Sequence, residues 1–261
     1  MVWNFDPKNY KFTSESMDQV LDLVKENGLS VEWVLDTHPH ADHVMASAQL
    51  KERTGAPNAI GALVPEIAKI WADLYNLPNA FDPDRDFDHL FQEGETFKIG
   101  ELEAKVMLSP GHTLGSITYV CGDAAFVHDT LMQPDAGTSR SDFPGGTTAE
   151  LWDSIQDILA LPGNTRLYIG HDYGTDDRDE PRWEATVDEH RAHNIHVKDG
   201  TKREDYIARP QKRDPTPSLP NPPPVTSTHH NLPHTQKAYR PRAVDHKHKK
   251  NTTDRPDGAP A

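Results

Sequence analysis

Three histidines and one aspartate lie close together near the start of the chain, in the stretch Thr37-His38-Pro39-His40-Ala41-Asp42-His43. Imidazole nitrogens and carboxylate oxygens are ligands that zinc, iron and manganese accept. The pattern H-x-H-x-D-H is far more specific than an isolated His-x-His pair. The stretch therefore predicts a metal site with His38, His40, Asp42 and His43 as ligands. Asp42 and His43 are also the residues that we expect to act directly in catalysis.

The flanking sequence predicts how these ligands are presented. The apolar run that contains Val31, Val34 and Leu35 is typical of a buried strand over residues 31–36. Residues 44–53 have a helical pattern, which Gly55 ends. The ligands therefore belong to a loop between a strand and a helix, where a rigid scaffold can hold functional side chains.

Further candidate ligands follow strand or turn signals later in the chain. The alternating strand 102–108 leads to His112, and the strands 117–121 and 124–127 lead to Asp129. The short strand 167–170 leads to His171. We expect these side chains to converge at one edge of a sheet.

Seven ligands of this kind are compatible with two chemistries. In a dinuclear hydrolase, His38, His40 and His112 would hold one ion, Asp42, His43 and His171 the other, and Asp129 would bridge them. In a mononuclear site, His38, His112 and Asp129 would form the two-histidine, one-carboxylate face of a non-haem Fe(II) centre. The spacing of the ligands leaves both arrangements open.

The remaining pattern predicts an α/β protein with a two-sheet sandwich covered by helices. Helices are expected over 14–27, 65–74, 148–160 and 181–195, with a short strand over 60–63 and a polar loop over 78–90. The apolar pattern stops near residue 209, and eleven of the 22 prolines lie beyond it. We therefore expect a catalytic domain over 1–208 and a disordered Pro/His-rich tail over 209–261.

Charge and composition exclude several classes of protein. Residues 1–208 carry a net charge of −20 and the tail carries +6, so the body lacks the clustered cations that nucleic acid binding needs. No apolar run reaches the roughly 18 residues of a membrane span, and the N-terminus has no apolar signal region. We expect a cytoplasmic protein, with a mitochondrial location as the alternative if the true N-terminus is longer. The single cysteine, Cys121, is expected to pack in the core.

Several motifs together resemble the metallo-β-lactamase superfamily, in its persulfide dioxygenase and β-lactamase-hydrolase-like branch. They are THPHADH (37–43), SPGHT (109–113), HDTLMQPDAGTSRSDFPGG (128–146), GHDY (170–173) and WEATVDEHRAHNIHV (183–197). The resemblance implies a four-layer αββα sandwich with one Fe(II) per chain, held by His38, His112 and Asp129. It implies that glutathione persulfide is oxidised by O₂ to sulfite, with Arg140 and Tyr173 contacting the glutathione. A surface ion pair of Arg140 with Asp142, and packing of Tyr173, are the simpler alternatives.

The sequence departs from the family pattern in places. Related chains begin with a further strand pair, which this chain is expected to lack. His128 stands where the family has glycine, and we expect its side chain to point outward. Asn194 is followed by Ile195 and His196, without the arginine that the family has there.

Two other functions compete with the dioxygenase. The first is a dinuclear zinc thioester hydrolase of the glyoxalase II type, with two Zn²⁺ per chain. The second is a metal-binding or interaction protein without turnover. The sequence leaves the oligomeric state open, with a homodimer as one expected form.

Overall fold

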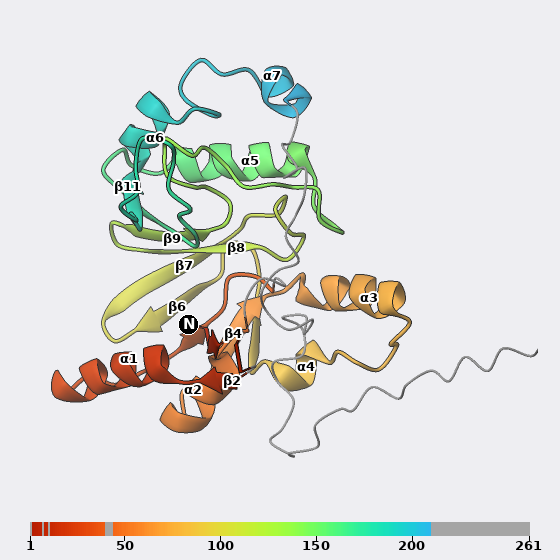
Figure 1. The fold of residues 1–261 in the computed structure, drawn as a ribbon, viewed down its shortest axis with the longest axis vertical. Coiled ribbons are helices and arrows are strands. Elements are labelled where there is room, and N and C mark those ends of the chain that lie inside the picture. The colour runs from red at the N-terminus through yellow and green to blue at the C-terminus, as the bar shows by residue number, and fades with distance from the viewer. Residues whose placement is uncertain (1, 7, 10, 40–43, 210–261) are drawn as a thin grey trace, which may run out of the picture. The chain divides into compact units, whose positions relative to one another are not determined.

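The computed structural model describes residues 2–6, 8–9, 11–39 and 44–209, and these residues contain two main sheets (Figure 1). The larger sheet has six strands in the order β11-β10-β9-β8-β7-β6. In chain order they are β6 (Thr96–Ile99), β7 (Leu102–Leu108), β8 (Ile117–Cys121), β9 (Ala124–His128), β10 (Arg166–Ile169) and β11 (Glu184–Thr186). The smaller sheet is parallel and contains β3 (Val34–Leu35), β4 (Asn58–Gly61) and β5 (His89–Phe91). A separate antiparallel pair is formed by β1 (Asn4–Asp6) and β2 (Lys11–Thr13).

Seven helices are found in the described part of the chain. They are α1 (Glu15–Glu26), α2 (Ser47–Thr54), α3 (Val64–Tyr75), α4 (Pro83–Asp86), α5 (Thr148–Leu159), α6 (Val187–His193) and α7 (Arg203–Ala208). None of these described helices is both long and apolar enough to cross a membrane.

Buried apolar side chains define the layers. Ile155 and Ile158 of α5 pack against Val127 and Leu167 of the larger sheet. On the opposite face of that sheet, a second cluster joins it to the smaller sheet through Ala59, Phe91, Val106, Ile117 and Tyr119. A third cluster places α1 and α2 against the smaller sheet through Met17, Val34 and Leu50. The order is therefore helix, sheet, sheet, helix, and Figure 1 shows α5 and α1 on opposite sides of the strands.

This arrangement confirms the predicted αββα sandwich. The strands over 102–108, 117–121 and 124–127 and the helices over 14–27, 65–74 and 148–160 are found within a few residues of their expected limits. The expected lack of a first strand pair stays a prediction. The division at residue 208 also stays a prediction, because residues 210–261 lie outside the described part.

Three elements differ from the sequence prediction. The helix expected over 181–195 begins only at Val187, because Thr186 and Glu189 form a reciprocal capping box and the preceding residues pair as β11. The loop expected over 78–90 contains α4, whose first turn is capped by the Asp82 carboxylate accepting from the backbone N–H of Arg85. The strand expected over 31–36 is paired only at Val34 and Leu35.

One buried acid lies at the end of β3, two residues before the predicted metal ligands. Asp36 is held by its backbone N–H, which donates to the carbonyl of Ala59 at 2.9 Å. Its carboxylate lies among the apolar side chains of α1, β3 and α2, including Leu21, Trp33 and Leu50. Burial raises the pKa of Asp36 to about 6, because the charged form loses its hydration.

This shift predicts a pH-dependent stability. The pKa of Asp36 is higher in the folded state than in the unfolded state. Its contribution to stability is therefore present below about pH 4 and is lost as the pH rises through about 6. In metal-free protein, Asp36→Asn should raise the free energy of unfolding at pH 8 by up to about 3 kcal/mol, with little effect near pH 4. Urea unfolding at the two pH values measures this difference.

Asp88→Asn provides a control of opposite sign. Lys51 donates to the Asp88 carboxylate at 2.7 Å and holds the pKa of Asp88 below its usual value. Asp88→Asn should therefore lower stability at pH 8. If Asp36→Asn also destabilised the protein at pH 8, the carboxylate would be stabilised by its surroundings and the argument from burial would be wrong.

Candidate metal centre

Strand direction explains why ligands that are distant in sequence meet. β8 is antiparallel to both β7 and β9, and β10 is parallel to β9, so β7, β9 and β10 all run the same way. Their carboxyl ends therefore lie at one edge of the larger sheet. The loops that leave this edge carry His112, Asp129 and His171, while His38 comes from the end of β3 in the smaller sheet.

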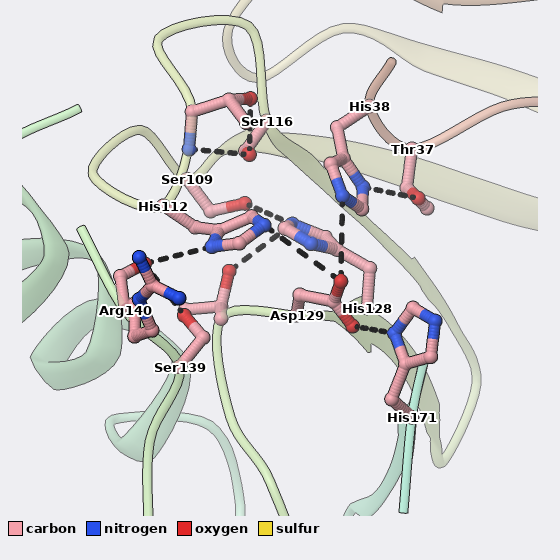
Figure 2. Close-up of polar contacts among 12 residues, drawn as sticks. Thr37, His38, Ser109, His112, Ser116, His128, Asp129, Ser139, Arg140 and His171 are labelled. Atoms are coloured by element: carbon pink, nitrogen blue, oxygen red, sulfur yellow. Dashed lines mark hydrogen bonds and ion pairs between the residues drawn. The ribbon is translucent and has the colours of Figure 1, made fainter. Parts of the chain in front are cut away.

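His38, His112 and Asp129 converge in a buried cluster (Figure 2). The Asp129 Oδ2 atom lies 3.5 Å from His38 Nε2 and 3.7 Å from His112 Nε2. All three potential ligand atoms lie within 4.8 Å of one another, and each residue is at most 5% exposed. Two imidazoles and one carboxylate at these separations form a metal-binding site.

The orientation of His112 fits a bound cation. Its Nδ1 lies 2.8 Å from the backbone carbonyl of Arg140, and a carbonyl can only accept, so Nδ1 carries the proton. In the neutral imidazole this leaves the lone pair on Nε2, the nitrogen that faces Asp129 Oδ2. A lone pair and a carboxylate oxygen that face each other in a buried site are well suited to share a divalent cation.

Asp129 stays ionised although it is buried. Burial alone would raise its pKa, but contacts from His171 and His38 outweigh this and hold the pKa of Asp129 well below its usual range. His171 Nδ1 lies 2.7 Å from Asp129 Oδ1 and donates to it. The two carboxylate oxygens therefore have different surroundings, because Oδ2 faces His38 and His112 while Oδ1 accepts from His171.

Glycine is needed next to this carboxylate. A Cβ atom on Gly170 would lie 2.5 Å from Asp129 Oδ1. Gly111 has a φ of +130° and a Cβ there would lie 2.2 Å from the backbone nitrogen of Leu151 in α5. The motifs SPGHT and GHDY therefore contain glycine because their loops approach Asp129 and α5 too closely for a side chain.

The other predicted site residues are placed as follows. His40, Asp42 and His43 lie outside the described residues. Arg140 forms two hydrogen bonds of 3.0 Å to Asp142, and its guanidinium lies over the ring of Phe143, 5.1 Å from its centroid. Tyr173 is 79% exposed, and its ring stacks on that of His171 at 5.6 Å.

The expectation that His128 points outward is wrong. Its side chain is buried beside the ring of His38, with 4.7 Å between the ring centroids. Its Nε2 lies 3.1 Å from Thr130 Oγ1 and 3.4 Å from Ser109 Oγ. The backbone φ of +43° lies in the left-handed region, which glycine adopts more readily than histidine.

The contacts that hold the loop around Arg140 are not apparent from sequence patterns. Asn194 Nδ2 donates to the carbonyl of Gly137 at 3.0 Å. The backbone N–H of Thr138 donates to His196 Nδ1 at 2.9 Å, and the Thr138 hydroxyl contacts the hydroxyl of Tyr206. These contacts hold the chain two residues before Arg140, whose carbonyl orients His112. His196, which replaces the family arginine, therefore has a structural role here.

Comparison with known proteins agrees with this geometry. Residues 7–171 match the family model of the metallo-beta-lactamase superfamily, and the chain belongs to that superfamily. A beta-lactamase hydrolase-like protein of Agrobacterium fabrum is 52% identical over 219 residues, which cover 84% of this chain and 50% of the relative. The chain thus spans about half the length of that curated relative.

Two further proteins are similar to this chain in fold or in sequence. The crystal structure of ETHE1 from Myxococcus xanthus has a TM-score of 0.60 and 29% identity, covering 79% of this chain and 88% of that one. A hydroxyacylglutathione hydrolase of Rhodospirillum rubrum is 32% identical over 158 residues, covering 60% of this chain and 54% of the relative. The chain is therefore similar to a solved structure of this fold and to a relative named a hydroxyacylglutathione hydrolase.

The backbone conformation of His128 generates a prediction. His128→Gly and His128→Ala both remove the imidazole, but only glycine adopts a φ of +43° without strain. In metal-free protein, the glycine variant should be more stable than the alanine variant by about 1 kcal/mol. Urea unfolding of the two variants measures the difference. An alanine variant as stable as the glycine variant would show that the backbone at this position is not strained.

Proposed function

We propose that this chain is a non-haem iron persulfide dioxygenase that oxidises glutathione persulfide to sulfite and releases glutathione. The observation that carries the proposal is the cluster of His38, His112 and Asp129, because two imidazoles and one carboxylate are the ligand set of mononuclear Fe(II) oxygenases. The hydrogen bond from His171 to Asp129 Oδ1 gives His171 a role at this site that does not need a second ion.

The chemistry of the reaction is balanced by O₂ and water. The outer sulfur of the persulfide is oxidised and O₂ is reduced. Both atoms of O₂ and the oxygen of one water end in the sulfite, and the inner sulfur leaves as the glutathione thiol. Fe(II), held by the three ligands, would provide open positions that bring sulfur and O₂ together.

The chain's own residues prepare the site for this reaction. His112 is held in its ligand tautomer by the carbonyl of Arg140, and Asp129 is kept ionised by its imidazole neighbours. Burial of the cluster excludes bulk water from the ligands. Arg140 is linked to the site through Phe143, whose ring lies edge-on to His112 at 5.2 Å. Its guanidinium is suited to bind a carboxylate of the tripeptide.

Metal content and reaction class test the proposal together. Protein purified at low oxygen without added metal should contain about one iron and little zinc per chain, and it should consume O₂ when given glutathione persulfide. Asp129→Ala should abolish iron retention, because it removes the carboxylate that faces both imidazoles. Asp123→Ala, which removes an acid paired with Arg166 outside the cluster, should retain the iron.

The alternative is a dinuclear zinc thioester hydrolase, which the similarity to the Rhodospirillum rubrum hydroxyacylglutathione hydrolase favours. About two zinc ions per chain, with thioester cleavage in the absence of O₂, would support this hydrolase and overturn the dioxygenase. Full iron occupancy in Asp129→Ala would overturn the three-ligand site itself.

Arg140 provides a separate prediction about substrate binding. Asp142 engages the guanidinium through Nε and Nη2, which leaves other N–H groups of the five to a substrate carboxylate, although Asp142 partly offsets the positive charge. Arg140→Ala should then raise KM for the persulfide about tenfold, with a smaller effect on kcat. Asp142→Asn should leave KM unchanged or lower it, because it removes the negative charge that offsets the guanidinium. Steady-state oxygen uptake measures both constants. Equal increases in KM for the two variants would mean that only the ion pair matters, and would remove Arg140 from substrate binding.

A further inference from the structure

Arg178 joins the two loops that carry Asp129 and His171. Its Nε and Nη2 donate to the Asp135 carboxylate at 2.7 and 3.0 Å. Its Nη1 and Nη2 donate to the two oxygens of Asp172, and Nη1 also donates to the carbonyl of Glu180 at 2.7 Å. A guanidinium has five N–H groups, and each of them has an acceptor here. The side chain is 11% exposed.

The Asp172 carboxylate is equally well satisfied. Besides the two bonds from Arg178, it accepts from the backbone N–H groups of Gly174 at 3.1 Å and Arg182 at 2.7 Å. The hydrogen bonds from Arg178 hold the pKa of Asp172 well below its usual range. The side chain of Asp172 is only 4% exposed, so the loop from 172 to 182 is folded around a buried ion pair. Such a pair is costly to break when one partner is removed.

Both acids that Arg178 binds are close in sequence to residues of the metal site. Asp172 directly follows His171, and Asp135 lies in the loop that begins at Asp129. Between these loops, His171 Nδ1 donates to Asp129 Oδ1 at 2.7 Å. Arg178 therefore restrains the two chain segments whose separation sets this hydrogen bond.

We propose that Arg178 is a positioning residue for the metal centre. By fixing Asp172 against Asp135, it holds His171 where its Nδ1–H orients the Asp129 carboxylate, so that Oδ2 stays directed at His38 and His112. Lysine cannot replace it, because an ammonium has three donors and lacks the planar fork that engages both acids at once. The inference rests on the metal site of the proposed function, but it does not depend on the reaction or the substrate.

The affinity for Zn²⁺ tests the role of Arg178. Titration of metal-free protein against a chromophoric chelator at 25 °C should show a roughly 10- to 100-fold loss of affinity in Arg178→Lys. The matched control is Arg203→Lys. Arg203 also makes two hydrogen bonds to one carboxylate, that of Asp153, but this pair joins α7 to α5 on the surface. This control should keep the wild-type affinity.

A double-mutant cycle tests whether Arg178 acts through His171. In a His171→Ala background, Arg178→Lys should cause no further loss of Zn²⁺ affinity. In metal-free protein, the ring nitrogen chemical shifts of His171 should report a protonated Nδ1 in the wild type and a mixture of tautomers in Arg178→Lys.

Two results would overturn the proposal. A loss of Zn²⁺ affinity that persists in the His171→Ala background would mean that Arg178 does not act through His171. A lower melting temperature with unchanged affinity and an unchanged His171 tautomer would mean that Arg178 only anchors the loop.

If Arg178→Lys fails to fold, Asp135→Asn replaces it as the test. This variant weakens only the two bonds to Asp135, so it should reduce the Zn²⁺ affinity by a smaller factor. Absence of oxygen uptake would refute the dioxygenase but leave these comparisons valid.

Discussion

The site depends on a single buried anion, the carboxylate of Asp129. Placing an unpaired carboxylate in this interior would cost several kcal/mol. The cost is offset because His171 donates to one oxygen and His38 lies 3.5 Å from the other. The same arrangement makes the anion useful, because the oxygen that faces the two imidazoles is the one available to a cation. Charge stabilisation and metal binding are therefore two consequences of one geometry.

The fold supplies this geometry by strand direction rather than by proximity in sequence. Three parallel-running strands of the larger sheet end at one edge, and β3 of the smaller sheet delivers His38 to the same place. The two sheets are held together by buried side chains such as Phe91, Val106 and Ile117. Because these side chains fill the space between the sheets, His38 cannot shift relative to Asp129 without disturbing the core. Packing far from the metal thus sets the distance between ligands.

Sequence patterns could predict the site residues that come directly after strands. The predicted strands are followed within a few residues by His112, Asp129 and His171, and the direction of the strands brings these residues together. The conformation of His128 could not be predicted, because it depends on a positive φ that no side-chain pattern reveals. The carbonyl of Arg140 is also hidden from sequence, since every residue has a carbonyl and only the path of the loop selects this one. The role of Arg178 is hidden for a similar reason. Its acceptors are the carboxylates of Asp135 and Asp172 and the backbone carbonyl of Glu180, and only the path of the loops brings these groups together.

Electrostatics limits how an anionic substrate could approach this centre. Residues 1–208 carry a net charge of −20, so long-range forces repel an anion, although salt screens them beyond about 8 Å. Attraction must therefore come from nearby positive charge, and the candidates are the metal and the guanidinium of Arg140. Asp142 neutralises that guanidinium and keeps it next to Phe143. A substrate carboxylate on the other N–H groups would therefore meet a guanidinium whose charge Asp142 already offsets. Binding at such a site would favour a ligand that also reaches the metal, because two contacts together oppose the repulsion of the acidic body more strongly than either one alone.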